Sequence, residues 1–110
     1  MKAQTAVEII EVLANRRSPR SLDATAVLLK DDLLAVLEAA RWAPSAFNGQ
    51  PWRFYVGQRG DEVFAQILDS LAPFNQGWAY RSSVLILVAG LPAREDGGAN
   101  HWTQNWYWWF

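Results

Sequence analysis

The feature that most constrains this chain is the apolar run from Ser83 to Gly90, which reads SSVLILVAG when counted from Ser82. It is rich in leucine and β-branched residues and shows no polar alternation, which predicts a strand covered on both faces. The other predicted strand is Trp52–Val56, where apolar and polar residues alternate. Two strands do not make a self-sufficient sheet. We therefore expect the missing neighbours to come from another subunit or from a longer chain.

A first helix is predicted over Ala6–Asn15. Thr5 and Glu8 have the spacing of a capping box, and apolar residues follow at helical intervals. The helix should stop before Pro19, because a proline bars its predecessor from the helical conformation. Residues 16–23, which follow this helix and include Pro19, are expected to form a loop.

A second helix is predicted over Lys30–Ala43, where Pro44 ends it. Leu34 lies off its apolar stripe and indicates a second buried face, for which a partner subunit is a candidate. The stripe itself consists of Leu33, Val36, Leu37, Ala40 and Ala43.

A third helix is predicted over Asp61–Leu71, between a Gly57–Gly60 turn and Pro73. A short helix is possible over Asn75–Arg81. The element order is then α-α-β-α-(α)-β. The expected fold class is α+β, with helices packed on an incomplete sheet.

Composition narrows the chemistry. The 110 residues carry a net charge of −1, no cysteine and one histidine, His101. This excludes disulfides, thiolate metal sites and a cysteine nucleophile, and gives no case for a metal site or a nucleic-acid partner. The longest apolar stretch, Val84–Leu91, is less than half of the roughly 20 residues of a membrane span. The N-terminus has no apolar run of signal-peptide length, so no membrane association and a cytoplasmic location are expected.

One candidate site is a basic loop that contains Arg16, Arg17, Ser18 and Arg20 and is stiffened by Pro19. Guanidinium groups bind phosphate oxygens in bidentate fashion, so the loop could hold a phosphate dianion. Alternatively, the arginines only complement the negative end of the first helix. A nucleic-acid patch is a weaker reading because interleaved aromatic residues are lacking.

A second candidate is the loop from Pro44 to Pro51. Ser45, Asn48 and Gln50 can both donate and accept hydrogen bonds, which suits the edge of a flavin ring. The prolines at both ends would reduce the ordering cost of binding. The alternative is an ordinary Asn-Gly turn. A third segment, Asn75-Gln76-Gly77-Trp78, is by itself an ordinary loop.

Taken in series, these segments resemble the FMN-dependent nitroreductase family over about Val7–Leu91. The resemblance rests on RRSPRSLD, then DLLAVLEAARWAPSAFNGQPWRFYV, then FNQGWAYRSSVLILVAG. The helix that runs into Pro-Ser-x-x-Asn-x-Gln-Pro-Trp is its most specific part. It implies a partial nitroreductase-like fold that is normally completed in an intertwined homodimer, with each of two flavins at the interface.

The resemblance also divides the cofactor-binding residues between two subunits. The basic loop would hold the phosphate and ribityl groups of one FMN. The Pro44–Pro51 loop would reach the flavin bound mainly to the other subunit, and Asn75 would make a polar contact to the ring. The implied set is Arg16, Arg17, Ser18, Arg20, Pro44, Ser45, Ala46, Asn48, Gln50 and Asn75.

The activity implied by the resemblance is hydride transfer from NADH or NADPH to flavin N5, then to a nitroaromatic, a quinone or a similar small-molecule acceptor. No catalytic side chain is predicted, because the flavin carries the chemistry.

The C-terminal part departs from the family pattern. Residues 1–93 correspond to the N-terminal half of a nitroreductase-like domain, whereas 94–110 form an atypical tail with four tryptophans between residues 102 and 110. The tail is either an aromatic binding platform or the unpacked end of a truncated product. There are then two alternatives to a flavoenzyme: a non-catalytic fragment without a complete flavin site, and a small interaction module that uses the tail.

Overall fold

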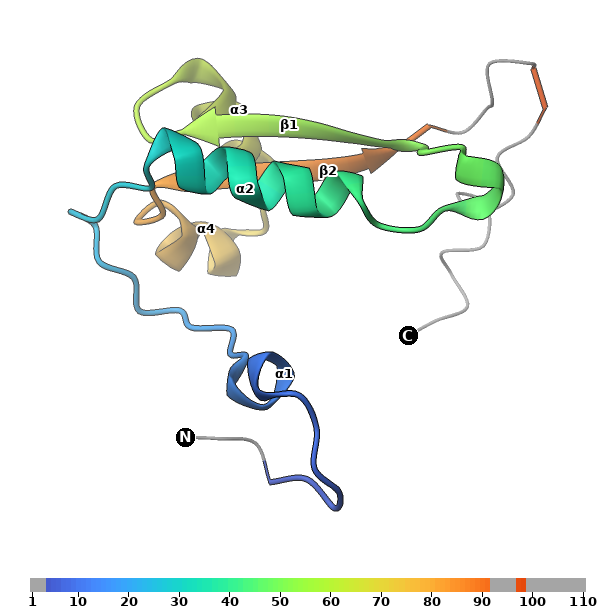
Figure 1. Ribbon diagram of the computed structural model, residues 1–110. Helices are drawn as coiled ribbons and strands as arrows, with labels where there is room; N and C mark the ends of the chain where they lie inside the picture. Colours follow the sequence, from blue (N-terminus) through green and yellow to red (C-terminus); the bar gives the residue numbers. More distant parts are fainter. Residues whose placement is uncertain (1–3, 92–96, 99–110) are drawn as a thin grey trace.

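The computed structural model describes residues 4–91 and 97–98. The predicted tail, 94–110, lies outside them except for Gly97 and Gly98. The described chain contains the predicted order of elements, and its α+β class is confirmed (Figure 1). In order, they are α1 (Glu11–Asn15), α2 (Lys30–Arg41), the 3₁₀ turn η1 (Ala46–Asn48), β1 (Trp52–Gln58), α3 (Glu62–Ser70), α4 (Pro73–Ala79) and β2 (Val84–Gly90).

The two strands form an antiparallel pair, with Trp52 opposite Gly90 and Gln58 opposite Val84. The predicted alternation in β1 is confirmed, since its odd-numbered residues are exposed and its even-numbered residues are half-buried up to Val56. The strand runs to Gln58 and not only to Val56, because Gly57 and Gln58 continue the pairing with β2. At the other end, the Leu91 N–H donates to the Pro51 carbonyl at 2.7 Å, which closes the ladder beside η1.

Helix α3 packs directly against β1. Its buried side chains are Phe64 and Ile67, at 6% exposure each. A Cβ at Gly57 would overlap the backbone nitrogen of Phe64, so only glycine permits this approach of helix and strand. Asp61 caps α3 by accepting hydrogen bonds from the N–H groups of Phe64, at 2.7 Å, and Gln58, at 2.8 Å.

Helix α4 begins at Pro73 and ends at Ala79, two residues earlier at each end than predicted. Pro73 both follows α3 and starts α4, since a proline at the first helical position loses no hydrogen bond. The Gln76 amide connects the two helices by donating to the carbonyls of Asp69, at 3.3 Å, and Leu71, at 2.8 Å. Ala79 is the most buried of the described hydrophobic residues, at 1% exposure.

Helix α2 lies along the strands in Figure 1 and matches its predicted start. Leu33 is its one buried residue among those described. Val36 was predicted on the buried stripe but is 52% exposed, and Ala43 lies past the end of the helix and is exposed. The apolar stripe is therefore wider than the surface that the described residues cover. Leu34 is exposed, which leaves the prediction of a second contact face open.

Helix α1 corrects the first helix prediction. It starts at Glu11 and not at Ala6, its N-cap is Ile10, and the predicted Thr5–Glu8 capping box is not formed. Helices of this length are marginal unless an apolar face is packed. Here Ala14 alone is buried in the helix. The exposed apolar residues of this arm, among them Val7, Ile10, Val12 and Leu13, lack a surface to pack on within the described chain.

The segment between α1 and α2 is an extended loop, as predicted for its first part, with one turn at Asp23. The Asp23 carboxylate accepts hydrogen bonds from the N–H and hydroxyl of Thr25, which lowers the pKa of Asp23. Further along, the Arg59 guanidinium donates to the carbonyls of Ala26, at 2.5 Å, and Ser82, at 3.0 Å. Arg59 thereby ties this segment to the end of the sheet next to α3.

The strand β2 was predicted to be covered on both faces. Within residues 4–91 and 97–98 none of its side chains is fully buried, and Leu87 and Val88 are exposed. Its only partner strand among these residues is β1. The hydrophobic surface of β2 thus exceeds what the described part of the chain covers. No helix in this part has the length and apolar character of a membrane span.

Candidate functional site

The basic loop follows α1 directly, because the helix ends at Asn15 and Arg16 has extended backbone geometry. Arg16 Nη1 donates to Ser18 Oγ at 3.2 Å. Arg16 and Arg20 are exposed, and within the described residues neither forms an ion pair with a carboxylate. Two guanidinium groups without acidic partners can bind an anion without first breaking a salt bridge.

Arg20 connects this loop to α4. Its guanidinium carbon lies 4.9 Å from the centroid of the Phe74 ring. Phe74 directly precedes Asn75, whose Oδ1 accepts a hydrogen bond from Trp78 Nε1 at 3.3 Å. The two amide N–H donors of Asn75 have no partner among the described residues. The structure therefore brings two of the three sequence-predicted segments together.

The Pro44–Pro51 loop is held by its own hydrogen bonds. The Gln50 backbone N–H donates to Ser45 Oγ at 3.0 Å, and the Asn48 N–H donates to the Ser45 carbonyl at 3.1 Å. Gln50 Nε2 donates to Asn48 Oδ1 at 2.8 Å. The polar side chains of the predicted set, Ser45, Asn48 and Gln50, thus lie together and fix the shape of the loop.

The backbone of this loop differs from the predicted Asn48-Gly49 turn. The left-handed conformations fall on Phe47, Asn48 and Gln50, with φ of 52°, 54° and 43°, whereas Gly49 has φ of −69°. Left-handed geometry in residues other than glycine costs energy and is concentrated at functional sites. Gly49 instead allows the Ala46 carbonyl to lie close to it, since a Cβ there would be 3.2 Å from the Ala46 carbonyl oxygen.

Phe47 is a feature that the sequence interpretation missed. Its side chain is 95% exposed at the tip of the strained loop. Its place inside the Pro-Ser-x-x-Asn-x-Gln-Pro motif was the available signal.

The two clusters do not meet within one chain. The η1 loop lies past the C-terminal end of α2, whereas α4 and α1 lie toward and below the other end (Figure 1). The 12 residues of α2 alone span about 18 Å. Arg20 and Asn75 therefore belong to one cluster, and Ser45, Asn48 and Gln50 to another.

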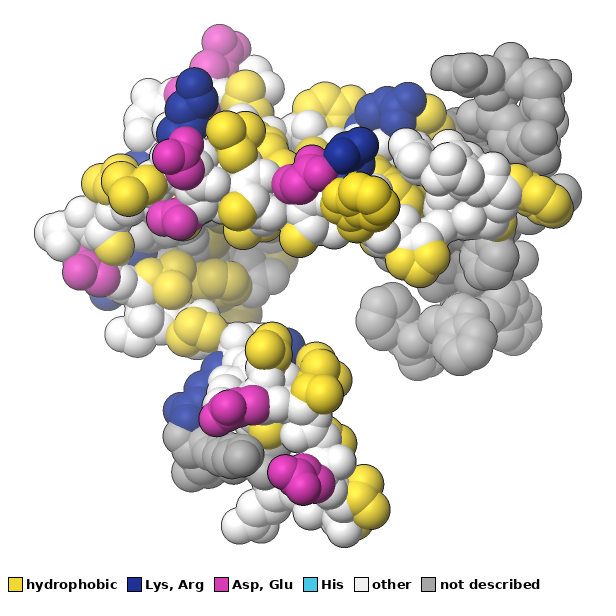
Figure 2. All heavy atoms as spheres, viewed as in Figure 1, with side chains coloured by type: hydrophobic (Ala, Val, Ile, Leu, Met, Phe, Trp, Pro, Cys, Tyr) yellow, Lys and Arg dark blue, Asp and Glu magenta, His cyan; other side chains and the backbone are white. Residues whose placement is uncertain are grey.

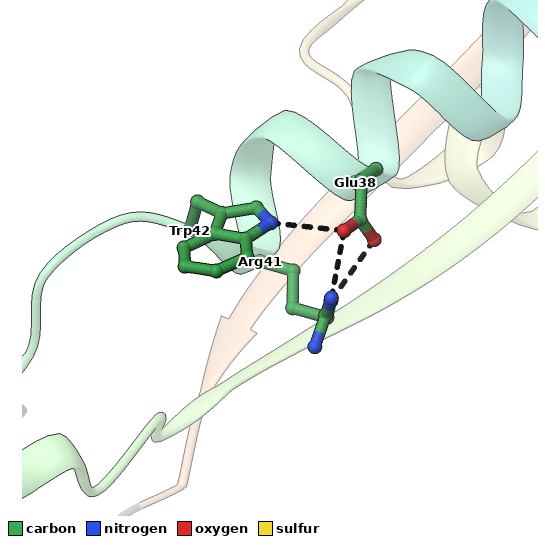
Figure 3. A network of polar contacts seen from close by, with 3 residues as sticks. All are labelled: Glu38, Arg41 and Trp42. Carbon is green, nitrogen blue, oxygen red and sulfur yellow. Dashed lines mark hydrogen bonds and ion pairs between the residues drawn. The ribbon is translucent and has the colours of Figure 1, made fainter.

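A third polar network, also missed, lies on α2 (Figure 3). Glu38 accepts two hydrogen bonds from Arg41, at 2.9 and 2.7 Å, and one from Trp42 Nε1 at 2.9 Å. These bonds, with the Arg41 bonds as the largest cause, lower the pKa of Glu38 from 4.5 to about 2. The i, i+3 and i, i+4 spacing could have predicted the network. All three side chains are exposed, so the network orders the surface of α2 near η1.

Hydrophobic side chains are interspersed with charged ones on the face shown in Figure 2, over both α1 and α2. Among these helices' residues, Leu13, Leu34 and Val36 are exposed. The surface around the two clusters is thus partly apolar.

Comparison with known proteins shows which family the chain resembles. The family model described as "Nitroreductase family" matches residues 13–85. The Bacillus subtilis protein YdgI, which bears the name of an NAD(P)H nitroreductase, is 39% identical over 83 residues, covering 74% of this chain and 38% of YdgI. The major NAD(P)H-flavin oxidoreductase of Aliivibrio fischeri is 36% identical over 84 residues, again 74% of this chain and 38% of the relative.

Solved structures of flavin-containing oxidoreductases are also similar to this chain. A crystal structure of an oxidoreductase containing FMN superimposes with a TM-score of 0.77 at 35% identity, over 86% of this chain and 48% of that one. A nitroreductase from Exiguobacterium sibiricum 255-15 in complex with FMN gives 0.63 at 41% identity, over 79% and 40%. This chain spans about two fifths of the length of the curated relatives that it matches.

Proposed function

The chain belongs to the nitroreductase family, and from this premise we propose that it contributes the phosphate-binding part of an FMN site in an NAD(P)H-dependent oxidoreductase. The observation that carries the proposal is the contact between Arg20 and Phe74. It joins the basic loop to the segment that contains Asn75, although the two are far apart in the sequence.

The residues present fit the chemistry of FMN. The basic loop offers the guanidinium groups of Arg16 and Arg20 and the hydroxyl of Ser18, which match a phosphate dianion. Asn75 offers amide donors, which match the acceptor atoms on the edge of a flavin ring. Arg17 extends the positive charge of the loop.

When bound, FMN supplies hydride chemistry, between NADH or NADPH as donor and a small-molecule acceptor such as a nitroaromatic or a quinone. The protein side chains bind and orient. In this proposal Arg16, Arg17 and Arg20 neutralise the phosphate, Ser18 donates to it, and Asn75 sets the orientation of the ring.

The second cluster serves a second copy of the chain. Because η1 lies past the C-terminal end of α2 and the basic loop lies toward the other end (Figure 1), one flavin does not contact both loops of one chain in this proposal. We therefore place Pro44, Ser45, Ala46, Asn48 and Gln50 at the flavin of a partner subunit. The internal hydrogen bonds of this loop reduce the ordering cost of that contact.

The test is a titration of the full chain with FMN and with riboflavin, which lacks the phosphate. Arg16→Ala removes a charge-assisted contact of about 1.5–3 kcal/mol and should weaken FMN binding by about tenfold to a hundredfold. Riboflavin binding should stay nearly unchanged. Lys30→Ala, which removes an exposed positive charge at the start of α2, is the matched control and should affect neither ligand.

Equal losses for FMN and riboflavin in Arg16→Ala would contradict the phosphate assignment. A complete lack of FMN binding by the unaltered chain would contradict the cofactor site itself. Light scattering on the FMN-loaded protein tests the two-subunit arrangement, which predicts a dimer and is contradicted by a loaded monomer.

A further inference from the structure

The contact between Arg20 and Phe74 connects two segments that are more than fifty residues apart in the chain. Phe74 is the second residue of α4 and is 67% exposed, and its ring lies under the Arg20 guanidinium at 4.9 Å. We propose that Phe74 is a positioning residue, which holds the Arg20 guanidinium in place for the phosphate-bearing end of the cofactor. The inference rests on the proposed function and adds a residue outside the predicted set.

Arg20 and Phe74 each directly follow a proline in the chain. Pro19 precedes Arg20, and Pro73 precedes Phe74 and starts α4. A proline fixes its own φ, so the residue directly before each of these side chains has few alternative backbone conformations. The Phe74 ring is the only side-chain partner of Arg20 found within the described residues. Without the ring, nothing described would restrain the guanidinium.

Stacking on a ring suits an arginine that also has to bind an anion. A guanidinium meets an aromatic ring through its flat face, whereas it donates its hydrogen bonds in its own plane. The Phe74 contact uses no hydrogen-bond acceptor, so it leaves the N–H groups of Arg20 for phosphate oxygens. A carboxylate partner would instead occupy those N–H groups and cancel the charge.

The same contact holds the proposed phosphate-binding arginine close to the residue proposed to contact the flavin ring. Because Phe74 and Asn75 are consecutive residues, an Arg20 that rests on Phe74 is held next to the residue proposed to contact the flavin ring. The loop after α1 has few other anchors, since α1 is short and largely exposed. The contact thus positions the Arg20 side chain on α4 without adding a buried contact to the fold.

The experiment is a double-mutant cycle read by FMN affinity on the full chain, with Phe74→Leu, Arg20→Ala and the double variant. Phe74→Leu keeps an apolar side chain but removes the ring face, and should weaken FMN binding by about two- to fivefold. The same substitution in the Arg20→Ala background should have no effect. Phe74→Tyr keeps the ring face and should bind FMN as the unaltered chain does.

Thermal unfolding of each variant separates positioning from folding, because Phe74 is exposed and Leu and Tyr should both leave the transition unchanged. Coupling between the two sites, with rescue by Tyr, supports the inference. Additive effects, or equal losses for Leu and Tyr, overturn the inference while leaving the proposed function intact. A lack of FMN binding by the unaltered chain overturns both.

Discussion

Two regions of this molecule differ in how closely the observed helices and strands match those predicted from the sequence. In residues 52–91, helix α3 buries Phe64 and Ile67, and β1 and β2 pair over their full length. In residues 4–29, the predicted helix of ten residues shrinks to the five of α1, although its apolar spacing is as regular as that of α3.

The difference lies in the surface that each pattern meets. The apolar face of α3 lies on a strand whose Gly57 lets the helix approach. The apolar face predicted for 6–15 has no such surface among the described residues, and exposed apolar side chains do not stabilise a helix. An amphipathic pattern therefore predicts a stable helix only where its apolar face has a surface to pack on.

The largest test of this contrast removes one apolar side chain from each region. Phe64→Ala should lower the free energy of unfolding by about 3–5 kcal/mol, which rivals the total stability of a small domain. Leu13→Ala, in exposed α1, should change it by less than about 0.5 kcal/mol. Urea unfolding followed by circular dichroism measures both. Similar costs for the two variants would mean that α1 is packed in solution.

A second test adds a methyl group at two glycines. Gly57→Ala places a Cβ against the Phe64 backbone and should cost about 1–3 kcal/mol through forced separation of α3 and β1. Gly77→Ala lies in α4 with open space around it and should instead stabilise by about 0.5–1 kcal/mol. Opposite signs in thermal unfolding are the expected result. A destabilising Gly77→Ala would contradict the open environment of α4.

The smallest effect concerns acid sensitivity. The N–H groups of Phe64 and Gln58 lower the pKa of Asp61 below its ordinary 3.8. A carboxylate with a lowered folded-state pKa stabilises fully above its unfolded pKa and loses that contribution as pH falls through the folded one. Asp61→Asn keeps an acceptor for the cap but cannot titrate. Its stability should match the unaltered chain near neutral pH and fall less steeply below about pH 4.

The control for acid sensitivity is Glu38→Gln on α2. The pKa of Glu38 is also lowered, to about 2, but its main partner is the Arg41 side chain, and such an exposed ion pair is screened by solvent, whereas Asp61 bonds backbone N–H groups. We expect a smaller change in the acid limb of stability than with Asp61→Asn. A larger change would mean that the α2 network, and not the α3 cap, dominates the acid response.

The helices and strands were predicted best where an apolar pattern packs on a neighbouring element of the described chain. The alternation in Trp52–Val56 and the helix predicted over Asp61–Leu71 are both confirmed, and α3 packs on the strand that precedes it in the chain. The start of α1 and the burial of Val36 depend on surfaces elsewhere, which a periodic pattern does not identify. The continuation of β1 through Gly57 was missed because glycine commonly marks a turn, whereas here it permits a close contact.

The candidate site was predicted as a set of residues and not as an arrangement. The resemblance supplied the basic loop, the Pro44–Pro51 loop and Asn75, and their roles stay predictions. The stack of Arg20 on Phe74 and the left-handed backbone of Phe47 could not be read from residue types. Both arise from the folded path of the chain, which decides which side chains meet.

The hydrogen bond from Leu91 to Pro51 fixes where the chain leaves its sheet. Because the strands are antiparallel, the last residue of β2 emerges beside the first residue of β1, next to the η1 loop (Figure 1). The arm before α2 arrives at the opposite side, next to α4. The two clusters of the candidate site thus lie toward opposite ends of the sheet: the arm before α2 carries the arginines toward one end, and the η1 loop, which contains Asn48, lies at the other.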